Sequence, residues 1–494
     1  MVCTFHLLVT DFGGAALPDE VLLDIFTFYV KGADEEEEWI TLVHVCRGWR
    51  YIVFASPLRL DLRLCVRGKT HVREMLDIWP ALPIVISPHN GQWISEITEN
   101  IITALEHHNR VRRISLLYFP VPGWGLERFL EMMQHPFPAL THLDLWDWFD
   151  KGEGAAVIPD SFLGGSAPLL ESLELTGVAF PALPKLLLSA NHLIRLDLRD
   201  IAHAGYISPE VMVTSLSSVA QLRYFGLTFD SPHSRPSSSS RRPPPMLRTT
   251  LPTLTHFSFQ GVSEYVEDFM ARVDAPLLRD VNISFFNQLI FDIPQLSQFI
   301  NHVEKFNGLN AKVSFSKDSA SVELSSETDH RLLLGISCNQ ADWQLSSVAQ
   351  LCGLSSYPIS TSESLTVTIN SGDAQHFGQF DIDPSQWVEL LHLFTNVENL
   401  YLAEDVGLHT VTALQGLVGE SVTQMLPALQ RLFLEGLQPR GSTWEAAVSF
   451  VAARQRLGCP TVIHRWEEER ESEDGFDESE QEPDSEWESD EAED

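Results

Sequence analysis

The chain has 494 residues, more than the roughly 250–300 that one compact core usually serves, so several domains or one elongated repeat array are expected. Its net charge of −35 argues against a general nucleic-acid binder, which needs a basic face to displace phosphate counterions. No apolar run reaches the roughly 20 residues that cross a bilayer, so no membrane span is expected.

The N-terminal residues and the cysteines indicate in which cellular compartment the protein is expected. Met1 to Asp11 lack the basic segment and the small-residue cleavage site of a signal peptide. The six cysteines form no C-x-x-C pair, so the sequence predicts neither a zinc ribbon nor a redox motif. Reduced, mostly buried thiols are expected, and we expect a cytoplasmic or nuclear protein.

Residues 15–60 are predicted to form two or three short helices. Pro18 suits a first helical turn, and apolar residues then recur at helical spacing from Leu22 to Tyr29. An acidic loop interrupts the pattern, and a second apolar set runs from Trp39 to Val53. We expect residues 61–109 to be a helical connection to the rest of the chain.

Residues 110–466 carry a recurring pattern, apolar-x-x-apolar-x-apolar. The first seven matches begin 23 to 32 residues apart, and two more follow after a long gap; they begin at Val111, Leu140, Leu170, Leu193, Leu222, Leu254, Leu278, Val397 and Leu429. The last two apolar positions alternate as in a strand with one buried face. Helical stretches such as 126–134, 209–219 and 263–273 lie between matches. The pattern predicts an irregular α/β solenoid with a strand and a helix per repeat.

Three stretches depart from this pattern. Between Val303 and Thr395 the motif is degraded, although strand-like pieces at 312–315, 332–337 and 365–369 and a helix at 343–351 are predicted. Residues 231–248 are rich in Ser, Pro and Arg and are predicted to be a disordered insert. From Glu467 to Asp494, 17 acidic residues and one basic residue give a net charge of −16, which predicts a disordered acidic tail.

Motifs for catalysis are absent from the sequence. No G-x-G-x-x-G follows a predicted strand, and Walker-type, G-x-S-x-G and H-E-x-x-H motifs are missing. His107 and His108 are adjacent, but neighbours on a helix point to different faces. We therefore expect a non-enzyme with no catalytic residue, no metal site and no cofactor.

Two segments of the N-terminal region resemble the F-box family. Residues 17–26, LPDEVLLDIF, are similar to its first half, and residues 43–50, VHVCRGWR, are similar to its second half. Further segments, including 56–62, 76–83 and 342–347, resemble the expanded F-box family of mushroom-forming fungi, whose members carry leucine-rich repeats. The asparagine that commonly follows the strand in such repeats is missing here.

The resemblance implies a role and a set of contacts. Family F-boxes dock on the Skp adaptor of SCF-type cullin–RING ubiquitin ligases, and the repeats hold the protein substrate. Carried over position by position, the adaptor-binding residues would be Leu17, Pro18, Leu22, Ile25, Phe26, Val45, Cys46 and Trp49. The sequence does not identify the protein substrate, because it contains no recognisable substrate-binding motif.

Residues between and after the buried strand positions are expected on the concave face of the solenoid. The candidates for substrate binding are Asp144, Trp146, Glu174, Asp197, Arg199, Ser258, Gln260, Asn282, Tyr401 and Phe433. Exposed aromatic residues among them would be natural hot spots.

Two alternatives stay open. The N-terminal helices could be only a cap on a leucine-rich scaffold with no link to a ubiquitin ligase, since terminal repeats need capping. The acidic tail could be a solubilising run or could attract a basic partner.

Overall fold

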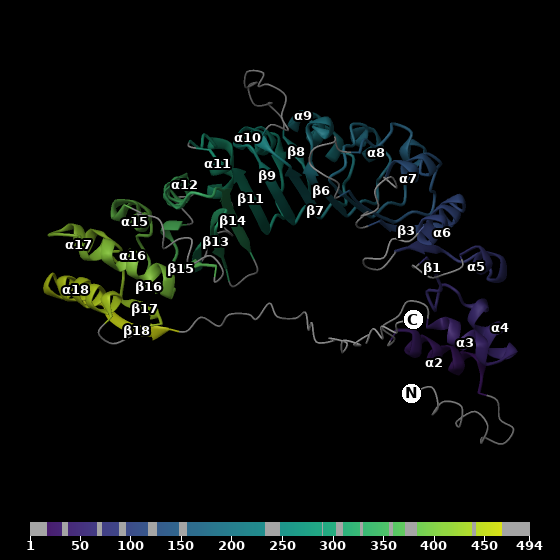
Figure 1. The fold of residues 1–494 in the computed structure, drawn as a ribbon, viewed down its shortest axis with the longest axis horizontal. Coiled ribbons are helices and arrows are strands. Elements are labelled where there is room, and N and C mark those ends of the chain that lie inside the picture. Colours follow the sequence, from purple (N-terminus) through teal and green to yellow (C-terminus); the bar gives the residue numbers. More distant parts are fainter. Residues whose placement is uncertain are drawn as a thin grey trace, which may run out of the picture.

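The computed structural model describes residues 17–31, 38–66, 72–87, 95–116, 126–147, 156–232, 248–288, 290–302, 310–326, 330–354, 359–370, 383–436 and 441–466. These parts form a mixed α/β arch in which one long sheet lines the inner side and helices cover the outer side (Figure 1). None of the described helices is long and apolar enough to span a membrane. The predicted acidic tail, 467–494, and most of the predicted insert, 233–247, lie outside the described residues.

Three short helices open the described chain, in agreement with the prediction for residues 15–60. They are α2 (Asp19–Lys31), α3 (Trp39–Val45) and α4 (Arg47–Ala55). Asp19 and Glu20 lie in the first turn of α2 and Lys31 in its last, which matches the helix dipole. The three helices lie at one end of the arch (Figure 1).

The sheet has 16 strands, and most neighbours are parallel. In spatial order they are β1 (Leu64–Val66), β2 (Ile84–Ile86), β3 (Val111–Leu116), β4 (His142–Trp146), β5 (Ser172–Thr176), β6 (Arg195–Ile201), β7 (Tyr224–Phe229), β9 (His256–Gly261), β11 (Asp280–Phe286), β14 (Arg331–Ser337), β13 (Ser319–Ser325), β12 (Asn310–Phe315), β15 (Ser364–Ile369), β16 (Asn399–Leu402), β17 (Arg431–Glu435) and β18 (Val462–Trp466). Each of the nine pattern matches leads into or begins a strand. A two-residue pair, β8 (Thr249–Thr250) with β10 (Val273–Asp274), lies outside this sheet.

Helices connect most of the parallel strands, because a parallel pair needs a long crossover connection. They are α5 (Val72–Ile78), α6 (Ser95–Glu106), α7 (Leu126–Met132), α8 (Leu183–Leu187), α9 (Pro209–Leu216), α10 (Ser263–Met270), α11 (Pro294–His302), α12 (Ala341–Leu354), α15 (Pro384–Leu391), α16 (Glu404–Gln415), α17 (Ser421–Gln424) and α18 (Ser442–Arg456), with 3-10 turns η1 (Phe162–Gly165) and η2 (His203–Gly205). The predicted helices at 126–134, 209–219, 263–273 and 343–351 correspond to α7, α9, α10 and α12.

One continuous core runs between the sheet and the helices from β1 to α18. The apolar pattern builds it, because pattern residues on neighbouring strands are in register: Leu143, Leu173, Leu196, Phe225, Phe257 and Val281 form one buried row. Each strand–helix unit therefore buries its apolar side against its neighbours, and stability is shared along the stack.

The structure differs from the sequence predictions at three places. Residues 61–109 were expected to be a helical connection, but they also contain β1 and β2, so the sheet begins at Leu64. In the degraded middle stretch β12, β13 and β14 form an antiparallel meander, and β14 rather than β12 pairs with β11. Short connections such as 316–318 join only antiparallel neighbours, because a parallel pair needs a long crossover. The edge strand β18 was not predicted either.

Candidate functional site

Helix α2 has apolar residues on two opposite faces. Leu23 and Phe26 are buried, whereas Val21 and Phe28 are 41% and 83% exposed. Val21, Ile25 and Phe28 recur at helical spacing, so they form one stripe, and the exposed Leu17 lies two residues before the helix begins at Asp19. The helix packs through one apolar face and exposes a second one.

The buried side of the three helices forms a small core of its own. Phe26 is fully buried, and its ring lies 4.7 Å from that of Trp49. Trp39 is also fully buried, contacts Trp79 at 5.5 Å between ring centroids, and donates from Nε1 to the Arg63 carbonyl at 3.1 Å. This core includes Leu62, Leu64 and Leu82, so the helices are packed onto the first strand of the sheet.

The predicted adaptor-binding residues therefore divide between the surface and this core. Phe26 lies inside and offers no surface, because α2 needs it to pack against α4. Leu17, Pro18, Val45 and Cys46 are exposed, whereas Leu22, Ile25 and Trp49 are half-buried. The sulfur of Cys46 accepts from the Trp49 backbone amide at 3.4 Å and so caps the start of α4.

Sequence reasoning missed three exposed apolar residues on these helices. Val21 and Phe28 on α2 and Tyr51 on α4, which is 73% exposed, were not among the candidates. Tyr51 lines an open hollow with Arg47, Arg50, Phe54 and Ala55. The spacing of four and three residues from Ile25 could have identified Val21 and Phe28. We call Leu17, Val21, Ile25 and Phe28 the exposed stripe.

All ten substrate-binding candidates lie on strands at positions that alternate with buried ones, so their side chains point away from the helices, toward the inner side of the arch (Figure 1). One row crosses six neighbouring strands in register: Asp144, Glu174, Asp197, Gly226, Ser258 and Asn282. Two residues further along their strands, on the same face of the sheet, lie Trp146, Arg199 and Gln260. Tyr401 and Phe433 are separated from this group by β14, β13, β12 and β15.

A charged network occupies the centre of the first group. Arg195 donates from Nε to Glu174 Oε1 at 2.8 Å and from Nη2 to Asp197 Oδ2 at 2.8 Å. Arg199 donates to the same Asp197 oxygen at 2.7 Å. The guanidinium of Arg195 also lies 3.7 Å from the centre of the Tyr224 ring, a cation–π geometry.

Asp197 does not have the exposure expected of a contact residue. Its side chain is only 3% exposed, because two arginines enclose it. A Cβ atom at Gly226, the next position in the row, would overlap the Asp197 carboxylate. Gly226 therefore provides the space in which this carboxylate is held, and Asp197 positions Arg195 and Arg199 rather than meeting a partner directly.

Asp144 lies beside this network, and no arginine among the described residues forms an ion pair with it. Its Oδ2 accepts from the Ser115 hydroxyl at 3.3 Å, and its register partner is Glu174. Partial burial, followed by repulsion from Glu174, raises the pKa of Asp144 to about 6. The inner face thus presents a carboxyl group that changes charge near neutral pH.

The second group is aromatic. Tyr401 on β16 and Phe433 on β17 stack with ring centroids 4.3 Å apart and planes 8° apart. His464 on β18 stacks on Phe433 at 5.0 Å, and Trp466 meets Tyr401 edge-on at 5.4 Å. His464 and Trp466 were not predicted as site residues. Residues 462–466 lack the alternating apolar pattern by which the other strands were recognised. We call Tyr401, Phe433, His464 and Trp466 the aromatic ladder.

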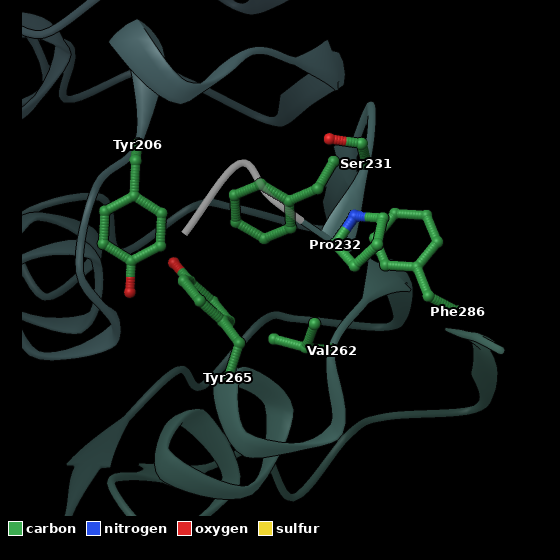
Figure 2. A pocket seen from close by; sticks show the side chains of 7 residues that line it. Tyr206, Ser231, Pro232, Val262, Tyr265 and Phe286 are labelled. Carbon is green, nitrogen blue, oxygen red and sulfur yellow. The ribbon is translucent and has the colours of Figure 1, made fainter. Parts of the chain in front are cut away.

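A pocket near the carboxyl ends of β7, β9 and β11 has little room for a ligand. Its lining residues are Tyr206, Phe229, Ser231, Pro232, Val262, Tyr265 and Phe286 (Figure 2). The volume of about 10 Å³ admits about one water molecule. The hydroxyl of the buried Tyr265 donates to the Ile207 carbonyl at 3.0 Å, and burial raises its pKa. The side chains pack against one another here and support the rim of the sheet.

The described residues include no group of three His, Cys, Asp or Glu side chains placed to hold a metal ion. In comparisons with known proteins, the chain matches no protein-family model, and no curated protein matches it significantly.

Proposed function

We propose that this chain is the substrate-recognition adaptor of an SCF-type cullin–RING ubiquitin ligase. In this proposal α2–α4 form an F-box that docks on the Skp adaptor. The stacked strand–helix units form an irregular leucine-rich-repeat solenoid, and its inner face binds the protein substrate for ubiquitin transfer by other subunits. The observation that carries the proposal is the exposed stripe on α2, in the segment whose sequence resembles the first half of an F-box.

The rival function is a leucine-rich scaffold whose N-terminal helices only cap the array. A cap is supported by the packing of Trp39 and Trp79 against the start of the sheet. However, the capping contacts use the buried face of α2 through Leu23 and Phe26. They leave Val21 and Phe28 without a packing role, and a docked partner would give these side chains one.

The test is to measure the affinity of the purified full chain for a Skp adaptor with and without the exposed stripe. The variant Val21→Ser/Phe28→Ser removes two exposed anchors, each worth roughly 1.5–3 kcal/mol if it becomes fully buried. We expect Kd to rise roughly 100-fold or more. The thermal midpoint should stay close to that of the parent chain, because both residues are on the surface.

Two control variants separate docking from capping. Val418→Ser removes a residue of the array that is 81% exposed, and it should leave both affinity and stability unchanged. Phe26→Ala removes a fully buried ring and should lower stability by about 3–5 kcal/mol, as loss of a packed aromatic does. Absence of adaptor binding by the folded parent chain would favour the scaffold.

A further inference from the structure

Arg199 is the most exposed charged group of the network on the inner face. Its side chain is 51% exposed, against 33% for Arg195 and 31% for Glu174. Asp197, the only carboxylate among the described residues that forms an ion pair with Arg199, is almost fully buried. The negative group is therefore enclosed within the network, and a partner approaching this part of the sheet meets the guanidinium of Arg199 first.

The guanidinium of Arg199 is held in one orientation. Its Nε and Nη2 both donate to Asp197 Oδ2, at 3.2 and 2.7 Å. Asp197 is in turn fixed by Arg195 and by the space that Gly226 leaves on the next strand. A guanidinium has five N–H groups, so Nη1 and the second hydrogen of Nη2 can still donate to a partner. A partner that binds them has little side-chain freedom to remove.

The backbone at Arg199 departs from a regular strand. The register between β6 and β7 shifts between Leu198 and Ile201, so β6 carries one extra residue there. Asp200 has a φ of 52°, in the left-handed region that costs energy for a residue other than glycine. Bulges of this kind re-aim a side chain at functional sites. Arg199 therefore lies at a local irregularity that the other strand positions of the network lack.

The neighbours of Arg199 on the same face are not acidic. Trp146 on β4 is in register with Thr176 on β5, and Thr176 is in register with Arg199 on β6. Trp146 and Thr176 are half-buried, so both keep accessible surface. We call Trp146, Thr176 and Arg199 the Trp–Thr–Arg row. It combines an aromatic ring, a hydroxyl group and a positioned cation over two strand spacings, or about 10 Å.

We propose that the Trp–Thr–Arg row is a peptide-binding site, in which Arg199 binds the carboxylate of an Asp or Glu side chain of the partner protein and Trp146 contacts an apolar side chain nearby. The two terminal nitrogens of Arg199 suit the two oxygens of a carboxylate, in a charge-assisted pair. About three extended residues cover the distance between the two contacts. This inference rests on the part of the proposed function in which the inner face binds a protein substrate.

The charge of the whole chain restricts the kind of partner further. A net charge of −35 repels a densely acidic ligand such as a nucleic acid or a polyglutamate run. A single carboxylate in an otherwise weakly charged segment is repelled much less and gains the local contact with Arg199. Arg199 is thus expected to select one acidic side chain, and Asp197 is a positioning residue that acts through it.

Selection of displayed random peptides on the immobilised full chain tests this site without a Skp adaptor. We use peptides of about twelve residues, several times the span of the row. The parent chain should enrich Asp or Glu at one position roughly tenfold, the factor expected for a hydrogen-bonded ion pair. An apolar residue should be enriched two to four positions away. Arg199→Gln should lose the acidic preference, and Arg199→Glu should replace it with Lys or Arg.

A reversed preference cannot result from misfolding, so the Arg199→Glu variant separates recognition from stability. Trp146→Ser should lose the apolar preference and keep the acidic one. Arg431→Glu makes the same charge change at an exposed position of β17, at the other end of the inner face, and should select the same peptides as the parent. The proposal is overturned if the parent enriches no acidic residue, or if the parent and Arg199→Gln select alike. Failure of Skp binding would leave these results unchanged, so the two proposals can fail separately.

Discussion

At the scale of single residues, Arg454 shows how a buried charge closes the end of the array. It lies on α18 and is fully buried. Its guanidinium donates to the carbonyls of Val422, Met425 and Leu429 at 2.9 to 3.2 Å, and to the Thr461 hydroxyl at 2.9 Å. One side chain therefore satisfies carbonyl groups from the turns before β17 and joins them to the segment before β18.

Replacing Arg454 should be costly for stability. Arg454→Met keeps much of the side-chain volume but removes the guanidinium donors to the Val422 and Met425 carbonyls, while the Leu429 carbonyl keeps the Thr461 hydroxyl as a donor, so we expect a loss of about 3 kcal/mol. Urea unfolding monitored by circular dichroism measures it. An unchanged midpoint would mean that water replaces the guanidinium without penalty.

Asp144 gives the inner face a dependence on pH with a definite sign. Its pKa is raised to about 6 in the folded chain, against an ordinary value of 3.8. Between these values the folded chain binds more protons than the unfolded chain, so ionisation of Asp144 lowers stability as pH rises. The Asp144→Asn variant lacks this contribution. Its stability relative to the parent should increase from pH 4.5 to pH 7, measured by urea unfolding at both values.

The sequence alone does not predict which of the proposed contact residues are exposed. Phe26 and Asp197 were chosen because motif and repeat positions suggested contact, yet both are buried. Phe26 packs on Trp49, and Asp197 is enclosed by Arg195 and Arg199 from its own strand. These contacts depend on the relative placement of helices and on side-chain conformation, which a one-dimensional pattern does not specify.

At the scale of elements, strands with a clear apolar pattern were predictable and short or polar strands were not. The pattern located β3 to β7, β9, β11, β16 and β17. β1 and β2 have three residues each, too few for alternation to be visible. The order of β12, β13 and β14 in the sheet depends on pairing with β11 and β15, which are distant in sequence.

The N-terminal helices also stabilise the neighbouring strands. Their core contains Leu62, Leu64 and Leu82, which would be uncovered without α2–α4. Removing residues 1–58 should therefore speed hydrogen exchange in β1 and β2 by at least tenfold. Exchange in β9 and β11 should change little, because contacts in a stack of this kind reach only neighbouring units. Mass spectrometry of exchanged peptides measures both, and equal acceleration along the whole sheet would contradict this view.

At the scale of the whole molecule, the arch separates two kinds of surface. The exposed stripe lies on the helices at one end, and the charged network and aromatic ladder line the inner side of the sheet (Figure 1). The helices that carry the stripe pack onto β1 through their own small core, and the continuous core then runs from β1 along the sheet. In the proposed adaptor, this arrangement would keep a substrate on the inner face at a set position relative to the ligase.

Isothermal titration calorimetry of the full chain with a purified Skp adaptor tests the central proposal most directly. We predict a complex of one chain with one adaptor, with a negative heat-capacity change from burial of the exposed stripe. The Val21→Ser/Phe28→Ser variant should lose most of the affinity. Absence of binding by a folded parent chain, or equal binding by this variant, would contradict the assignment of α2–α4 as the docking element.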